Sequence, residues 1–229
     1  MKLNNKKTKC IPFNSSKSRD FMPQLQLEDG TYLEVIYQLK LVGLVINSEL
    51  SWSAHVDYTV KRVNKIQCQL TRFKQIGATQ DKLVQFYTLK IRSILIFGSV
   101  CFHSSLSVQL SQLLELQQKR SLAIILGSQY RNYTHARNLV NLPRLDSLSK
   151  EASLKWAIKA QNDPKHSHLL PLSERTVNTR HRKKFTEYFC RTSKVYNSSI
   201  PSMTRALNKH HSENQWHYLV TKYFVAANY

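Results

Sequence analysis

The residues of this chain that could take part in metal or acid–base chemistry are scattered. It contains six aspartates, of which no two are adjacent: Asp20, Asp29, Asp57, Asp81, Asp146 and Asp163. Catalytic pairs of divalent metal ions are held by clustered carboxylates, and the sequence also lacks a Gly-rich phosphate loop and a nucleophile elbow. The four cysteines stand far apart without zinc-site spacing. We therefore expect no catalytic residue, metal ligand or bound cofactor in this chain.

The charge balance points instead to binding of a polyanion. The chain has 34 basic and 14 acidic residues, a net charge of +20 and a pI near 10.0. Such an excess favours nucleic acid or an anionic membrane as the partner. A membrane span needs about 18 apolar residues in succession, and the longest candidate, residues 91–101, is shorter and contains Arg92. We expect RNA or DNA as the partner, and no membrane.

The same features favour an intracellular protein, in the nucleus or the cytoplasm. The widely spaced cysteines do not suggest a disulfide framework, and we interpret them as reduced thiols. The first residues are polar and basic, without the apolar core of a signal peptide.

Two basic regions are candidate nucleic-acid contacts. The first lies opposite an apolar helical face and comprises Lys61, Arg62, Lys65, Arg72 and Lys74. The second is a basic segment within residues 165–194, which hold eight Lys or Arg and two Glu; its candidates are Arg180, Arg182, Lys183, Lys184 and Arg191. An ordinary solvated surface is the alternative for both regions.

The pattern of apolar residues predicts an α+β fold that is mainly α. Loose alternation near Ile11 and a strand at 40–46, together with an Asp29–Gly30 hairpin signal, indicate a small antiparallel β-unit of about four short strands. From residue 51 the apolar spacing becomes three to four, which predicts helices at 51–76, 79–97, 107–126, 133–141 and 146–160. Ser51 or Ser53 is the expected N-cap of the first helix.

Beyond residue 162 the apolar pattern weakens. We expect a basic, extended or partly ordered C-terminal arm with short helices, and no second core. The predicted divisions are therefore a β-unit at 1–48, a helical bundle at 49–162 and the arm at 163–229.

Several motifs, in this order, resemble the reverse transcriptase of non-LTR (LINE-type) retrotransposons, from the end of the palm into the thumb. They are residues 40–44 (KLVGL), 50–55 (LSWSAH), 91–98 (IRSILIFG) and 114–120 (LELQQKR). A further resemblance, to the motif that closes many reading frames of these elements, lies in Cys190, Arg191, Thr192, Tyr196, Ser198 or Ser199, Ile200, Pro201, Leu207 and Asn208. The resemblance covers about residues 1–209.

This resemblance implies a nucleic-acid clamp separated from its catalytic half. In that family the paired aspartates and their Mg²⁺ lie upstream, and Met1 looks like an internal methionine of a longer protein. The segment with Lys40 and Gly43 corresponds to the primer grip, where a glycine lets backbone approach the primer. Trp52 would either stack on a base or seal the junction between strand and helix.

We expect the chain to bind a template–primer duplex without polymerising. Three alternatives remain open: a captured, non-enzymatic nucleic-acid-binding protein, an inert degenerate fragment of a transposon, and an unrelated scaffold protein.

Overall fold

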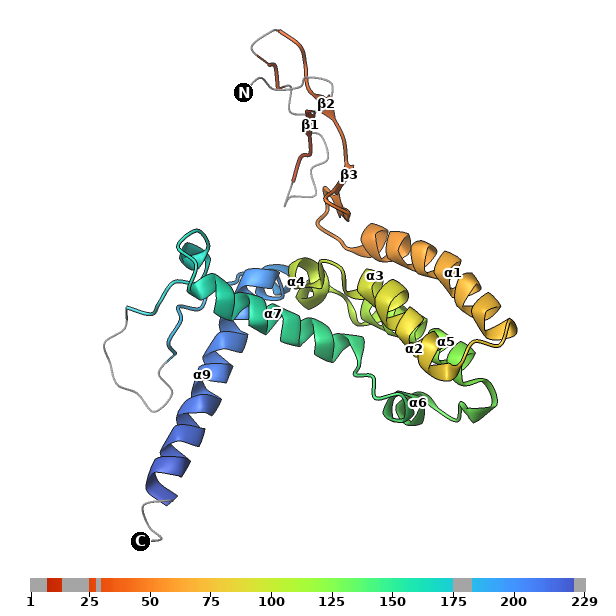
Figure 1. Cartoon of the computed structure of the whole chain (residues 1–229). Coiled ribbons are helices and arrows are strands. Elements are labelled where there is room, and N and C mark those ends of the chain that lie inside the picture. Colours follow the sequence, from red (N-terminus) through yellow and green to blue (C-terminus); the bar gives the residue numbers. More distant parts are fainter. Residues whose placement is uncertain (1–7, 14–24, 28–29, 175–182, 225–229) are drawn as a thin grey trace. The chain divides into compact units, whose positions relative to one another are not determined.

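A computed structural model of the chain describes residues 8–13, 25–27, 30–174 and 183–224, with side chains as far as residue 212 (Figure 1). The fold is α+β and mainly α, as the sequence predicts. The chain divides into two compact units. Unit 1 comprises residues 1–95 and 108–140, and unit 2 comprises residues 96–107 and 141–229. These units differ from the divisions at 48 and 162 expected from the sequence.

Four short strands form two separate pairs in unit 1. They are β1 (Lys9–Cys10), β2 (Glu34–Val35), β3 (Gln38–Leu41) and β4 (Leu44–Asn47). β3 and β4 are antiparallel, but β1 and β2 are parallel, so the single antiparallel unit that we expected is wrong in this respect. The hairpin expected near Gly30 is confirmed by an antiparallel bridge between Gln26 and Tyr32. Asp29 lies outside the described residues.

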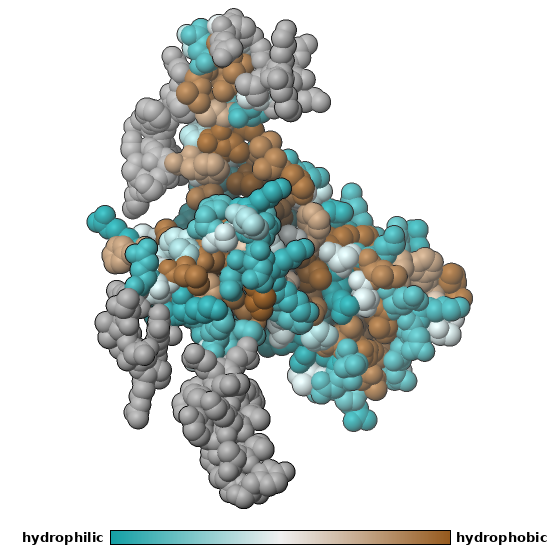
Figure 2. All heavy atoms as spheres, turned by 60° about the vertical axis from the view of Figure 1, so that its left-hand side comes forward, coloured by the Kyte–Doolittle hydropathy of each residue, from teal (hydrophilic) through white to brown (hydrophobic). Residues whose placement is uncertain are grey.

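The predicted strand at 40–46 is in fact the tip of the β3–β4 hairpin. Leu41 pairs with Leu44, and Val42 and Gly43 connect them with φ of 48° and 88°. Two successive residues with positive φ make a type I′ turn, whose twist matches that of the flanking strands. Gly43 is therefore required by the turn, and the hairpin tip exposes Val42 to solvent. Figure 2 shows hydrophobic side chains gathered in the upper part of the view, over the strands.

Helix α1 (Ser53–Gln75) matches the predicted first helix and buries one apolar face. Its end is a Schellman motif around Gly77, whose φ is 86°. There the Gly77 N–H donates to Lys74 O, and the Ala78 N–H donates to Phe73 O. The serine N-cap is wrong, because Trp52 occupies the cap position and its carbonyl accepts from the Val56 N–H.

The second predicted helix contains a wide π turn. It consists of α2 (Gln80–Phe86), the π-helical η1 (Tyr87–Arg92) and α3 (Ser93–Ile96). Its buried stripe has a strict spacing of four residues: Leu83, Tyr87, Ile91 and Leu95. An α-helix has 3.6 residues per turn and would rotate such a stripe away from its partner, and the wider turn compensates for that drift.

One helical stretch of the described residues, Gln80–Ser105, is long and apolar enough to span a membrane by length and composition, and 28% of its most apolar window is buried. This stretch is not one uninterrupted apolar run, because it contains Asp81, Lys82, Lys90 and Arg92. Part of its apolar content is the stripe from Leu83 to Leu95 that packs inside unit 1.

Helix α5 (Val108–Leu126) packs against α1 through a buried polar contact. Gln67 Nε2 donates to Gln117 O at 2.9 Å and contacts Ser121 Oγ at 3.0 Å. Nearby, Tyr87 OH donates to Gln118 Oε1 at 2.7 Å, and burial raises the pKa of Tyr87. Buried hydrogen bonds of this kind fix the register of α1, α5 and η1. The turn η3 (Gly127–Gln129) and α6 (Tyr133–Leu139), capped by Asn132, complete the described helical part of unit 1.

Unit 2 has a hydrophobic core of its own. Its elements are α4 (Ser99–Phe102), η2 (His103–Ser105), α7 (Leu145–Gln161), η4 (Ser167–Leu169), α8 (Ser193–Tyr196) and α9 (Ser199–Phe224). The buried core residues are Ala157, Ala160, Leu170, Phe185, Met203 and Leu207. The expectation of an arm without a second core is therefore wrong. The apolar residues of this core are separated by charged stretches of the sequence, so they show no local period.

Candidate nucleic-acid interface

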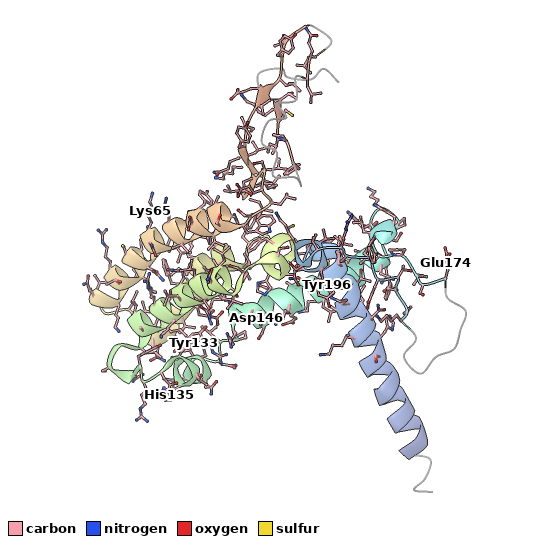
Figure 3. All side chains as sticks on the ribbon, turned by 180° about the vertical axis from the view of Figure 1, so that it is seen from behind. Lys65, Tyr133, His135, Asp146, Glu174 and Tyr196 are labelled. Atoms are coloured by element: carbon pink, nitrogen blue, oxygen red, sulfur yellow. The ribbon has the colours of Figure 1, made fainter. Side chains whose placement is uncertain are left out.

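Three cations lie in a line on the outer face of α1. Lys61, Lys65 and Arg72 are exposed, whereas Val63 and Leu70 on the opposite face are fully buried. At 1.5 Å of rise per residue, Lys65 lies about 6 Å and Arg72 about 16 Å along the axis from Lys61. Their spacings of four and seven residues keep them on one side of the helix. Lys65 points away from the neighbouring helices in Figure 3.

The acidic side chains that the structure describes do not neutralise these three cations. Within the described part of the chain, none of them forms an ion pair. Asp57 is the one acidic residue in the sequence of α1, against five Lys and Arg. We call Lys61, Lys65 and Arg72 the α1 cation line.

Lys40 and Arg62 meet at Tyr58, at the end of the line nearest the β3–β4 hairpin. Lys40 Nζ donates to Tyr58 OH at 2.6 Å and lies 4.5 Å from the ring centroid. The Arg62 guanidinium lies 5.6 Å from the same centroid. The hydrogen bond from Lys40 is the largest cause that lowers the pKa of Tyr58, and the charges of Lys40 and Arg62 add to it. Tyr58 thus holds Lys40 and Arg62 beside the α1 cation line. Nothing in the sequence around Tyr58 predicts this role.

Lys74 has a structural partner. Its Nζ donates to the carbonyls of Ile124 and Ile125, at the C-terminal end of α5. A cation at this end of a helix satisfies carbonyls that have no partner within the helix and interacts favourably with the helix dipole. A Cβ at Gly127 would approach Lys74 Nζ to 2.5 Å, so glycine also makes room for this contact. The structure thus separates Lys74 from the exposed cations with which the sequence grouped it.

Trp52 and His55 join the β3–β4 hairpin to α1. The Val45 N–H donates to His55 Nδ1 at 3.4 Å, and the two rings of Trp52 and His55 meet edge to face at 6.1 Å. Burial lowers the pKa of His55, which favours the neutral ring that can accept this bond. Trp52 is half-buried at this junction. Gly43 lies at the far end of the hairpin, in the turn.

The candidates of the basic segment in unit 2 differ from one another. Lys183 pairs with Glu187 at 2.7 Å, and Lys184 Nζ lies 3.1 Å from His211 Nε2. Arg191 is exposed and, among the described residues, has no ion pair. Arg180 and Arg182 lie outside the described residues.

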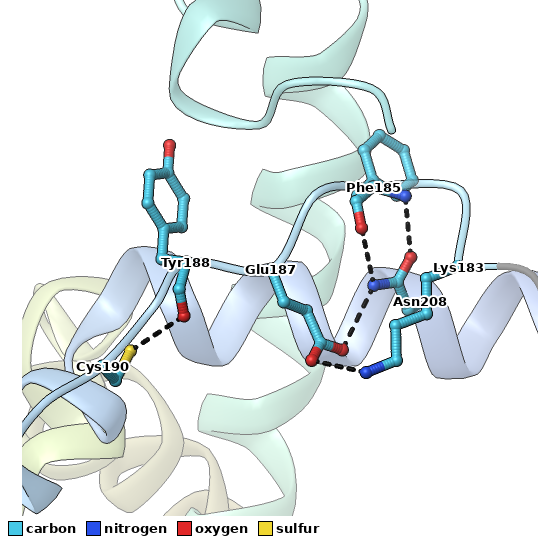
Figure 4. A network of polar contacts seen from close by, with 6 residues as sticks. All are labelled: Lys183, Phe185, Glu187, Tyr188, Cys190 and Asn208. Atoms are coloured by element: carbon cyan, nitrogen blue, oxygen red, sulfur yellow. Dashed lines mark hydrogen bonds and ion pairs between the residues drawn. The ribbon is translucent and has the colours of Figure 1, made fainter. Parts of the chain in front are cut away.

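The motif at residues 190–208 forms much of the framework of unit 2. Thr192 caps α8 by accepting from the Val195 N–H, and Ile200 packs against the core. Asn208 binds both backbone groups of Phe185: its Oδ1 accepts from the N–H at 2.9 Å, and its Nδ2 donates to the carbonyl at 3.1 Å (Figure 4). Asn208 of this motif thus holds an extended segment against α9.

The acidic residues that the structure describes do not form a metal site. No group of three or more His, Cys, Asp or Glu side chains that could hold a metal ion occurs among them. Asp146, for example, accepts from Lys150 at 2.8 Å and contacts His103 at 3.1 Å. Burial raises the pKa of Asp146, but the hydrogen bonds and charges of Lys150 and His103 outweigh it, so the net direction is downward.

No family model matches this chain, and no curated protein or solved structure is significantly similar to it. The resemblance to LINE-type reverse transcriptases thus remains an expectation from the motifs of the sequence.

Proposed function

We propose that this chain binds a nucleic-acid duplex along α1, in the manner of a thumb that holds a template–primer. The observation that carries the proposal is the α1 cation line: Lys61, Lys65 and Arg72 are exposed and unpaired within the described residues. A helix holds charged side chains at a regular spacing, as a nucleic-acid strand does its phosphates. The same side chains on flexible loops would lose more conformational entropy when they bind.

Lys40 and Arg62 extend this surface. Both are held near Tyr58, so their positions relative to α1 are fixed by a hydrogen bond and by contact with the aromatic ring. The contact of His55 with Val45 secures the hairpin from which Lys40 projects. A duplex laid on α1 would therefore meet a preorganised surface.

The proposed origin is the end of the palm and the thumb of a LINE-type reverse transcriptase. The order of its motifs favours this origin, and intracellular RNA or DNA is the corresponding partner. Polymerisation would require a pair of metal ions held by clustered carboxylates, and the six aspartates of this sequence are not adjacent. We propose binding of the template–primer without synthesis by this chain.

Fluorescence anisotropy with labelled 20-base-pair RNA–DNA and DNA duplexes tests the binding. For wild type, we expect affinity to fall linearly with the logarithm of salt concentration. Each B-DNA phosphate contact contributes roughly 0.9 to the magnitude of that slope. Substituting Lys61→Gln, Lys65→Gln and Arg72→Gln together should therefore reduce it by about 2.7.

A second triple variant, Lys155→Gln, Lys159→Gln and Lys165→Gln, is the matched control. It removes the same net charge from exposed residues of unit 2. We expect its slope to stay near that of wild type. Equal slopes for the two triple variants would contradict the proposal, because they would show that net charge, and not the α1 cation line, determines binding. Primer extension by the purified chain with Mg²⁺ would contradict the proposed lack of synthesis.

A further inference from the structure

An aromatic side chain in unit 2 is almost completely exposed. Phe189 is 93% exposed, the highest value among the large hydrophobic residues that the structure describes. Burying a phenylalanine ring is ordinarily favourable, because it removes apolar surface from water. Single exposed apolar residues are common on protein surfaces, so exposure of Phe189 indicates a binding site only together with its surroundings.

The backbone that carries Phe189 is fixed on both sides. Before it, Asn208 holds Phe185, whose ring is fully buried (Figure 4). Tyr188, the adjacent residue, donates from its OH to Leu169 O at 2.8 Å. After it, Thr192 caps α8. The exposed ring is therefore presented by an anchored segment of the chain.

A second exposed ring follows closely in the sequence and is stacked on a cation. Tyr196 is 49% exposed. The guanidinium carbon of Arg205 lies 3.6 Å from its ring centroid, and Arg205 Nη2 donates to Tyr196 O at 2.8 Å. This pair holds the Tyr196 ring in place and adds a positive charge beside it.

The surrounding sequence is free of negative charge. No acidic residue occurs between Glu187 and Glu213, and Arg191, Lys194, Arg205 and Lys209 lie within this interval. Arg191 comes two residues after Phe189 and is exposed without an ion pair among the described residues. Exposed aromatic rings interleaved with cations are the arrangement that binds single-stranded nucleic acid, because bases stack on the rings while cations contact phosphates.

We propose that Phe189 and Tyr196, with Arg191 and Arg205, form a single-strand binding site in unit 2. It goes beyond the duplex binding proposed for α1 and does not depend on it. Bases inside a duplex are already stacked on each other, so an exposed ring contacts unpaired bases more readily. The ligand is an unpaired run of a few nucleotides, of RNA or DNA.

The test uses the full chain and a fluorescein-labelled single-stranded oligo(dT) 20-mer. Stacking on an aromatic residue changes affinity by roughly 5- to 150-fold for each base. We expect Phe189→Ala to weaken binding within this range and to leave the salt slope unchanged, because it removes no phosphate contact. We expect Arg191→Gln to reduce the magnitude of the slope by about 0.7, the value for one contact with a single strand.

Phe97→Ala is the matched control, since it removes a half-exposed ring elsewhere in unit 2. Its affinity for the single strand should equal that of wild type. In a separate variant, Phe189→Trp, the tryptophan fluorescence should change on addition of saturating oligo(dT), because a base then stacks on the new ring. The change should also occur in the background of the α1 triple Gln variant.

Two results would overturn the proposal. One is that Phe189→Ala binds oligo(dT) as tightly as wild type does, which would assign Phe189 to another partner, such as a protein. The other is unchanged fluorescence of Phe189→Trp at saturation. Duplex binding should be unaffected by Phe189→Ala, so failure of this site and failure of the α1 surface are distinguishable.

Discussion

Replacing Val42 by Asn should stabilise the β3–β4 hairpin. Val42 has a φ of 48° and is 84% exposed. For an L-residue the left-handed region costs roughly 1–2 kcal/mol, and a β-branched side chain is especially unfavourable there. Asn tolerates this region, and Asn-Gly is a preferred pair in a type I′ turn. Because Val42 makes little buried contact, the substitution should lose little packing, and we expect a gain of about 1 kcal/mol.

Hydrogen exchange of peptides covering residues 37–48 measures this gain locally. The Ser48 N–H donates to Tyr37 O at 2.9 Å and reports on opening of the hairpin at its base. A gain of about 1 kcal/mol corresponds to about five-fold slower exchange through local opening. Peptides from unit 2 should exchange as in wild type, which separates a local effect from a global one.

Val42→Thr is the control that isolates the backbone effect. Threonine is polar but β-branched, so it should retain the strain and exchange at about the rate of wild type. If Val42→Thr protects the hairpin as much as Val42→Asn, the gain comes from removing an exposed apolar side chain, and the reasoning from φ is refuted. Hydrogen exchange at the wild-type rate in both variants would refute it as well.

Three further predictions concern contacts inside the two units. Because burial lowers the pKa of His55, the unfolded state binds a proton at higher pH than the folded state does. The free energy of unfolding should therefore fall as the pH drops below about 6.5, until the pH passes the folded-state pKa of His55. The urea midpoints of His55→Asn should depend less on pH over that range. Lys74→Met should cost about 1–2 kcal/mol in urea denaturation, because the last carbonyls of α5 lose their donor while the aliphatic stem remains. Asn208→Ala should cost about 2–4 kcal/mol, because both backbone groups of Phe185 lose a partner. Asn208→Asp should not restore stability, because its carboxylate would face the Phe185 carbonyl and the Glu187 carboxylate. Equal urea midpoints for Asn208→Ala and wild type would contradict the structural role.

Much of the helical part of unit 1 could be predicted from local patterns. The apolar spacing from Val56 to Leu70 and the glycine at 77 define α1 and its end, and Gly127 marks the end of α5 in the same way. The hairpin at Gly30 followed from its turn sequence. These features depend on residues close in the sequence, where periodicity and backbone preference act directly.

The features that could not be predicted depend on distant partners or on opposing local preferences. Val42 favours a strand by propensity, yet it lies in a turn because Leu41 pairs with Leu44. Lys74 looks like part of a basic face until α5 brings its carbonyls near. Phe185 lies in a basic stretch, and its burial depends on Leu170, Met203 and Asn208, which are distant in the sequence.

The candidate site was anticipated in part. Lys61, Lys65 and Arg72 are exposed on one side of α1, as the helical period predicts. The role of Tyr58 in holding Lys40 and Arg62 required the hairpin and the helix to meet, and no motif in the sequence signals it. The stacking of Arg205 on Tyr196 is equally invisible to periodicity, because α8 is a single short turn.

The order of the units along the chain has a consequence for biosynthesis. Residues 96–107 leave the ribosome before 108–140, yet they belong with residues 141–229. Unit 1 has all of its segments once residue 140 has emerged. The core of unit 2, against which Val100 packs, forms only after α7 and α9 have been synthesised. A nascent chain released early would expose residues 96–107 to chaperones and proteases. Truncating the gene between the helices of unit 2 should therefore yield a protein that is degraded or aggregates, and not a shorter folded protein.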